Sequence, residues 1–153
     1  MTRLLTVLLA FSLITFVNAQ VAKGEDGLYY NSQDNNLFTG IHKEYYANGA
    51  LKVEHALENG VHNGDTKLYF PNGKVQEVRA YSRGEKHGTW ITYNKKGVKT
   101  GVANYSSDVK HGSWMVWDDE GTLRYEMTYS NGAKTGTWNM YGNDGNLIAS
   151  MDY

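Results

Sequence analysis

The sequence predicts an all-β fold: an elongated, single-layer antiparallel β-meander built from hairpins that repeat every 24 residues. Three observations predict it. Glycines recur at a spacing of 24 residues, aromatic residues recur in the same register, and the segments between them alternate polar and apolar side chains. Alternation with a period of two is typical of strands, and a longer fixed period is typical of repeat proteins, whose units contact only their neighbours.

The composition excludes several functional classes. The chain has 153 residues, no cysteine, one proline and a formal charge of −1, which fits one small domain. A hydrophobic fraction of 41% is too high for a disordered chain. The absence of cysteine excludes disulfide scaffolds, thiolate zinc sites, iron–sulfur clusters and thiol catalysis.

Residues 1–19 predict a cleaved signal peptide. Arg3 is followed by an apolar stretch over residues 4–17 and by the small residue Ala19. That stretch has 14 residues, fewer than the roughly 20 that span a bilayer, which favours cleavage over an uncleaved anchor. The mature chain, residues 20–153, then has 14 basic residues (15 less Arg3) and 16 acidic ones, a net charge of −2. We therefore expect an exported protein, periplasmic or secreted, with no further transmembrane segment and no nucleic-acid partner.

The glycines form three columns that divide the chain into units. Five units occupy residues 40–153, and residues 20–39 form a degenerate N-terminal half repeat with a strand near Leu28-Tyr29-Tyr30. Thirteen of the 17 glycines lie on this lattice, and Asp108 interrupts the third column. The columns are Gly40, Gly64, Gly88, Gly112 and Gly136; Gly49, Gly73, Gly97, Gly121 and Gly145; and Gly60, Gly84 and Gly132.

Each unit predicts a β-hairpin followed by a return turn. The first strand follows the opening glycine, and a short polar loop such as Asp119-Glu120-Gly121 ends on a glycine suited to the left-handed position. The second strand alternates cleanly, as it does from Leu123 to Tyr129. We expect roughly ten strands from Ile41 onward, in a meander about 45 Å long at the usual strand spacing. The last strand, from about Leu147 to Tyr153, is a candidate exposed edge.

The aromatic residues also form columns. We expect the column on the first strands and the tyrosine column on the second strands to interleave on one face as a packing ladder. The tryptophan column stands two residues after its glycine, whereas Tyr93 stands five after, which predicts opposite faces. Either a bulge brings both columns to one side, or the tryptophans and their neighbours form an exposed patch that binds a partner. The first-strand column is Tyr45, Tyr69, Tyr93, Trp117 and Tyr141, the second-strand column is Tyr81, Tyr105, Tyr129 and Tyr153, and the candidate interaction surface is Trp90, Trp114, Val116, Trp138 and Met140.

The units resemble the MORN repeat. Gly64-Asp-Thr-Lys-Leu-Tyr-Phe-Pro-Asn-Gly73 and Gly112-Ser-Trp-Met-Val-Trp-Asp-Asp-Glu-Gly121 are similar to its bacterial variant, which recurs in proteins labelled YwqK-type antitoxins. The resemblance covers about residues 28–153 in five consecutive registers. It implies an open, elongated, twisted antiparallel sheet without catalytic residues. The eukaryotic relatives are associated with protein scaffolding and with membrane lipids, and no binding residue carries over to this chain.

Other polar groups have plain structural interpretations. His87 and His111 occupy equivalent turns about 10 Å apart, since two strands separate them, and we expect solvated side chains and no zinc site. His42, His55 and His62 have no metal-ligand spacing. Residues 118–121 predict a hairpin turn because they lack the alternating ligands of a calcium loop. The basic column, favoured as a solubilising edge over an anion site, is Lys86, Lys110 and Lys134.

The sequence therefore predicts an exported, non-enzymatic binding or scaffold protein with no catalytic residue, cofactor or metal. We expect it to bind another protein or to self-associate, through the aromatic face or by pairing of an exposed edge strand. The alternative is recognition of a glycan or a lipid surface by the tryptophan column and the neighbouring lysines. An antitoxin-type neutralising role is less favoured, since such a protein acts in the cytoplasm.

Overall fold

The computed structural model describes residues 21–153, so the expected signal peptide lies outside the described residues. These residues form strands and turns, with no helix among them. The 14 strands are β1 (Val21–Lys23), β2 (Tyr29–Asn31), β3 (Gly40–Tyr45), β4 (Leu51–Glu58), β5 (Val61–Tyr69), β6 (Val75–Ser82), β7 (Glu85–Lys86), β8 (Gly88–Tyr93), β9 (Lys99–Ser106), β10 (Val109–Lys110), β11 (Gly112–Trp117), β12 (Leu123–Ser130), β13 (Ala133–Tyr141) and β14 (Leu147–Asp152).

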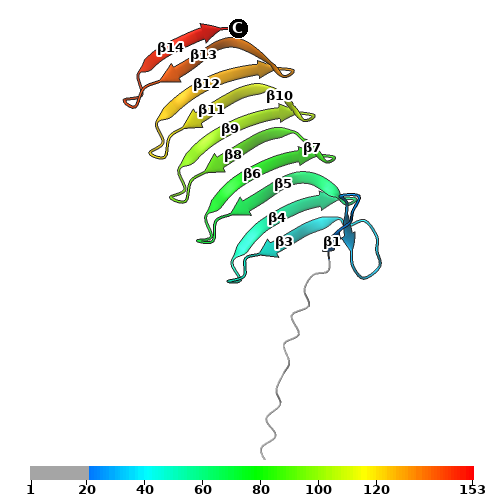
Figure 1. The fold of residues 1–153 in the computed structure, drawn as a ribbon. Coiled ribbons are helices and arrows are strands. Elements are labelled where there is room, and N and C mark those ends of the chain that lie inside the picture. The colour runs from blue at the N-terminus through cyan, green and yellow to red at the C-terminus, as the bar shows by residue number, and fades with distance from the viewer. Residues whose placement is uncertain (1–20) are drawn as a thin grey trace, which may run out of the picture.

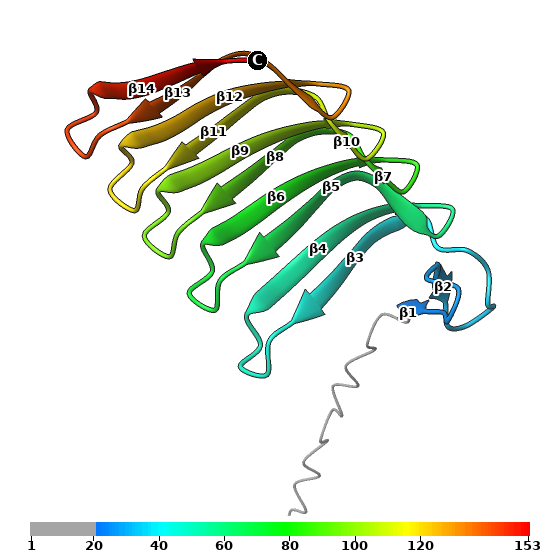
Figure 2. The ribbon, with the colours of Figure 1, turned by 45° about the horizontal axis from the view of Figure 1, so that its top comes forward.

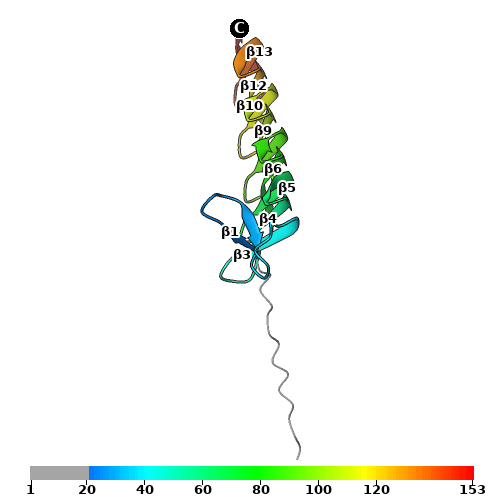
Figure 3. The same cartoon turned by 90° about the vertical axis from the view of Figure 1, so that its right-hand side faces the viewer.

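The main sheet is an open antiparallel meander. Ten strands follow one another in chain order from β3 at one edge to β14 at the other, and the two-residue strands β7 and β10 pair beside this path. Figure 1 shows the hairpins stacked side by side along one axis, and Figure 3 shows the same sheet edge-on as a single layer. The predicted all-β, single-layer meander is confirmed.

The hairpin turns have the same geometry in every unit. In the first, the Gly49 amide donates to the Tyr46 carbonyl at 2.9 Å, and Gly49 has a φ of 82°. The corresponding glycines of the other four turns also have positive φ. Each hairpin then has a β-bulge beside the turn, between Thr92 and Tyr93 in the third unit. The short loop that ends on a left-handed glycine is as the sequence predicts, and the structure adds the bulge.

The return turns place two consecutive residues in the left-handed region, as type I′ turns require. Asn59 and Gly60 have φ values of 47° and 76°. Asp108, which interrupts the glycine column, adopts the same conformation with a φ of 65°. Its carboxylate accepts a hydrogen bond from the Lys86 amide at 2.9 Å, and aspartate tolerates left-handed backbone better than most residues. Asp108 therefore interrupts the glycine column in the sequence but keeps the geometry of the return turn.

The strands β1 and β2 form a separate two-stranded sheet, which we call the cap. Figure 2 shows the cap beside the start of β3, and in Figure 3 it stands out from one face of the main sheet. It is held to the main sheet by the Tyr29 amide, which donates to the Gly60 carbonyl at 2.9 Å. The buried apolar residues of the described chain are Tyr29 in the cap and Val53 and Leu57 in β4. The core is thus confined to the N-terminal end.

Replacement of Gly73 by alanine should lower the free energy of unfolding by about 1 kcal/mol, because alanine is strained in the left-handed region. Gly73 has a φ of 80° and no atom within 4 Å of the position that a Cβ would occupy, so the cost comes from the backbone alone. Urea denaturation followed by circular dichroism measures it. Gly73→Asn is the control and should lose less, since asparagine tolerates this conformation. Equal losses in the two variants would contradict the argument.

Candidate functional site

One face of the main sheet has a continuous row of rings, and we call it the ladder face. Neighbouring rings lie on successive strands with centroids 4.8 to 6.0 Å apart, and most pairs are tilted or edge-to-face. These geometries are favourable for aromatic pairs. From the cap to the far edge, the row is Tyr29, His42, His55, His62, Tyr81, Trp90, Tyr105, Trp114, Tyr129, Trp138 and Tyr153.

The ladder contains the tryptophan column, and the expectation that the first-strand column would interleave with the second-strand tyrosines is wrong. The bulge beside each hairpin turn falls immediately before the first-strand aromatic residue and shifts its register. Tyr69 and Tyr141 instead donate their hydroxyl hydrogens to Glu54 at 3.2 Å and Glu126 at 3.1 Å. Those glutamates alternate along the strand with ladder-face residues such as His55, so they lie on the opposite face.

The candidate interaction surface lies together on the ladder face. Trp114 is opposite Met127 in the strand register, and Val116 is opposite Tyr125. The indole N–H groups of the three tryptophans donate to backbone carbonyls of the preceding strand, at 2.9 Å for Trp90 and Ala80. These indoles are half-buried and fixed, whereas Val116 is 38% exposed. The tryptophan column therefore serves the packing of the sheet as well as forming part of its surface.

Each lysine of the basic column lies over two rings of the ladder. The Lys110 Nζ is 4.4 Å from the centre of the Trp114 ring and 4.8 Å from that of Tyr129. Lys86 and Lys134 lie in the same way over the rings of their own units. Such cation–π contacts hold an ammonium group in place while leaving its charge at the surface. Within residues 21–153 none of the three ammonium groups forms an ion pair.

Sequence reasoning missed a histidine cluster at the N-terminal end of the ladder. His42, His55 and His62 come from three adjacent strands, and the Tyr29 ring of the cap lies 5.5 to 6.0 Å from all three. The Glu44 carboxylate accepts a hydrogen bond from the Nε2 of His55 at 3.3 Å. The signal lay in the repeat columns: His42 occupies the tryptophan position and His62 the lysine position of its unit.

Burial favours the neutral form of these histidines. It lowers the pKa of His62 from 6.5 to about 4, and the nearby charges of His55, Lys23 and Arg79 act in the same direction. Burial also lowers the pKa of His55, and the hydrogen bond to Glu44 opposes that shift. Within the described chain no group of three histidine, aspartate or glutamate side chains is arranged to hold a metal ion.

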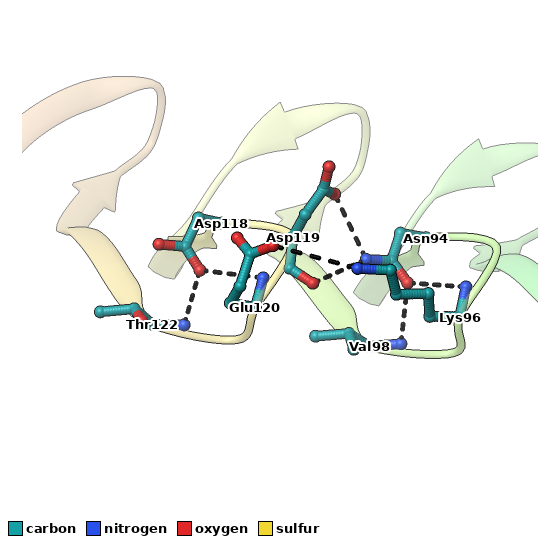
Figure 4. A network of polar contacts seen from close by, with 7 residues as sticks. All are labelled: Asn94, Lys96, Val98, Asp118, Asp119, Glu120 and Thr122. Atoms are coloured by element: carbon teal, nitrogen blue, oxygen red, sulfur yellow. Dashed lines mark hydrogen bonds and ion pairs between the residues drawn. The ribbon is translucent and has the colours of Figure 1, made fainter. Parts of the chain in front are cut away.

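The acidic turn at residues 118–121 is a hairpin turn, as predicted. The Asp118 carboxylate accepts hydrogen bonds from the Thr122 amide at 2.8 Å and the Glu120 amide at 3.2 Å, which lower its pKa (Figure 4). Asn94 has the equivalent place one unit earlier, and its side-chain amide donates to the Asp119 carbonyl at 3.0 Å. These side chains close one turn and join it to the next. The imidazoles of His87 and His111 belong to exposed residues of other turns.

The C-terminal end of the ladder face is hollowed and largely apolar. A shallow groove with a volume of about 210 Å³ lies across β12, β13 and β14. We call it the C-terminal groove; its lining includes Tyr125, Met127, Trp138, Met140, Met151 and Tyr153. Every residue of β14 is exposed, and among the described strands β14 pairs with β13 alone. The predicted exposed edge is therefore present, next to the groove.

Comparison with known proteins identifies the repeats. A family model described as MORN repeat variant matches residues 38–59, 63–82 and 110–131. These segments cover the hairpins β3–β4 and β5–β6 and the strands β11 and β12. The comparison with curated proteins finds no match. Residues 21–153 contain no helix of the length and apolarity that a membrane span requires.

Trp114→Ala should lower the free energy of unfolding by about 2 kcal/mol, because it removes a half-buried indole from between two tyrosines. Trp114→Phe keeps a ring there and loses the hydrogen bond to Asn104, so a loss of about 1 kcal/mol is expected. Chemical denaturation measures both. Trp117→Ala, in the same strand on the opposite face, is the control. A larger loss there than in Trp114→Ala would show that the ladder is not the main source of stability.

The histidine cluster predicts that the free energy of unfolding decreases as the pH is lowered. The unfolded chain protonates His62 near pH 6.5, whereas the folded chain protonates it near pH 4, so folding becomes less favourable as the pH falls through this window. The contribution of His62 that is lost is on the order of 2 kcal/mol. Urea midpoints between pH 7.5 and 4.5 measure the dependence. His62→Gln should flatten it, while His87→Gln, in an exposed turn, should leave it unchanged; the same slope in both variants would refute the assignment.

Proposed function

Because this chain is built from MORN repeats of the variant type, we propose that it is an exported, non-enzymatic binding protein that holds another protein at the C-terminal groove and the adjoining edge strand β14. MORN repeats are generally involved in binding and scaffolding. The narrower YwqK-type label and an antitoxin role stay predictions from the sequence. Export is supported by the pattern of residues 1–19, which predicts a signal peptide.

The observation that carries the proposal is the uneven covering of the ladder face. At the N-terminal end, the Tyr29 ring of the cap lies over three histidines, and Val53 and Leu57 are buried. At the other end, Tyr125 is 44% exposed, Met151 60% and Tyr153 47%, and no described segment covers them. An uncovered apolar groove beside an edge strand with one free side offers a partner both hydrophobic contact and backbone hydrogen bonds.

A second candidate function has its own observation. The ladder lysines hold three positive charges over aromatic rings without an ion pair among the described residues. Aromatic rings and cations together suit an acidic glycan or an anionic lipid surface. This surface extends toward the middle of the sheet, where Lys110 lies over Trp114 and Tyr129 outside the C-terminal groove, so binding there should depend on Lys110.

Met151→Glu should abolish partner binding, because it places a charge on the C-terminal groove. Val109→Glu is the control: Val109 is also exposed, at 42%, and lies in β10, which pairs with β9 and belongs neither to the groove lining nor to β14. Light scattering coupled to size exclusion gives the mass of the purified protein. Pull-down from the native secretion medium, with mass spectrometry, identifies co-purifying proteins.

A partner or a higher mass that both variants retain would contradict the proposal. Glycan or vesicle binding that is lost in Lys110→Gln and kept in Met151→Glu would favour the second candidate. Circular dichroism of each variant shows that it is folded.

A further inference from the structure

The two free edges of the main sheet are of different kinds. Each hairpin has a first strand and a second strand. Inside the sheet, the second strand of each hairpin pairs with the first strand of the hairpin that follows it. There are four such junctions: β4 with β5, β6 with β8, β9 with β11 and β12 with β13. The edge strand β14 is a second strand without a following first strand, and the edge strand β3 is a first strand without a preceding second strand.

The four junctions share one register. Val53 is opposite Leu68 and Glu54 is opposite Lys67 in the first junction. The same two pairs recur 24 residues later in each of the others, as Glu77 with Thr92, Gly101 with Val116 and Tyr125 with Met140, each followed by its neighbour. The junctions between β6 and β8 and between β9 and β11 consist of these two residue pairs alone. If the 24-residue series is continued from β14 into the first hairpin of another copy, Ala149 lies opposite residue 44 of that copy and Ser150 lies opposite its residue 43.

We propose that the protein assembles head to tail, with β14 of one copy pairing antiparallel with β3 of the next, Ala149 opposite Glu44 and Ser150 opposite Lys43. This inference rests on the proposed function: it names a second copy of the chain as the protein held at the C-terminal groove and β14.

The junction would bring the ladder of one copy up to the ladder of the next. Inside the sheet, each second-strand tyrosine lies against the tryptophan nine residues further on, as Tyr129 lies 5.2 Å from Trp138. The same step from Tyr153 leads to the position that His42 occupies in the next copy. That imidazole already stacks on His55 in its own copy at 5.9 Å. On that side of His42 the Tyr29 ring of the cap already lies 6.0 Å away, so Tyr153 of the neighbouring copy would meet the ladder at the cap.

The junction would also bury exposed apolar side chains on the opposite face. One position beyond these two pairs, toward the hairpin turns, Ile148 would come next to Tyr45, and each is 59% exposed. Removing such side chains from water favours association. The cap leaves these positions open, because it forms its own sheet beside the start of β3, as Figure 2 shows, while Tyr45 lies at the other end of that strand.

Only the head-to-tail arrangement reproduces a junction that the sheet already contains. Pairing of β14 with another β14, or of β3 with another β3, would join strands of the same kind, which occurs at none of the junctions between described strands of the main path. A head-to-tail contact is heterologous, so it can add copies in one direction and form open chains.

Engineered cysteines test the register directly, because the protein has none of its own. Directly opposite strand residues bring their Cα atoms within disulfide range. A mixture of Ser150→Cys and Lys43→Cys single variants should give disulfide-linked dimers under mild oxidation, and the double variant should give a series of longer species on a non-reducing gel. The control pair, Ser150→Cys with Glu44→Cys, is shifted by one residue and its side chains point to opposite faces, so it should not link.

Charge at the same position gives a second measurement. Ser150→Glu, opposite Lys43, should lower the concentration at which the mass from light scattering rises, and Ser150→Lys should raise it, each by up to about five-fold. Lys43→Glu mixed with Ser150→Lys should restore assembly.

Three outcomes would overturn the proposal. In the first, Ser150→Cys alone gives at least as much disulfide-linked dimer as the mixture with Lys43→Cys. In the second, the control pair Ser150→Cys with Glu44→Cys links as well as the mixture does. In the third, the protein is a monomer at all concentrations and no cross-link forms. In the last case, a foreign protein that is lost in Met151→Glu and kept in Val109→Glu would leave the proposed function standing with another partner. If no protein depends on Met151, the proposed function fails as well.

Discussion

The structure depends on contacts between rings on neighbouring strands. A sheet of one layer has no second layer against which to bury its side chains, so the usual source of stability is missing over most of its length. The rings of the ladder replace it: each half-buried tryptophan lies between two tyrosines, donates its indole N–H to the previous strand and is crossed by a lysine side chain. Stability therefore accumulates from strand to strand, and the buried apolar residues are confined to the N-terminal end.

Much of the fold could be predicted because it is set by local backbone chemistry. Glycines at positions such as Gly49 and Gly73 meet a need for positive φ that few other residues satisfy, and their spacing gives the hairpins, the turns and the meander. The cap is different. Its position depends on Tyr29 reaching three strands that come later in the chain, and no repeat pattern predicts that contact.

The candidate site was predicted less completely, for two physical reasons. Counting residues from Gly88 correctly separates Trp90 from Tyr93, but the bulge before Tyr93 removes that tyrosine from the ladder, and a bulge changes the register without a clear sequence signal. The histidines were missed because they are far apart in sequence and hold different repeat positions. They meet because adjacent strands bring them to one face, beneath the cap. The Trp90, Trp114 and Trp138 column was correctly grouped, and the structure adds the lysines that lie over it.

The uniform register of the junctions has a consequence for the evolution of chain length. Each hairpin pairs only with the adjacent hairpins, and the junctions between them are alike, so an in-frame duplication or deletion of 24 codons between Gly64 and Gly136 rebuilds a junction of the same kind. A change whose length is not a multiple of 24 codons places a glycine or a ring at the wrong position. The cap, by contrast, has contacts that no duplicated unit supplies. Descendants of this gene are therefore free to differ in the number of hairpins while keeping one N-terminal end, and the reach of the sheet becomes a trait that selection can change in steps.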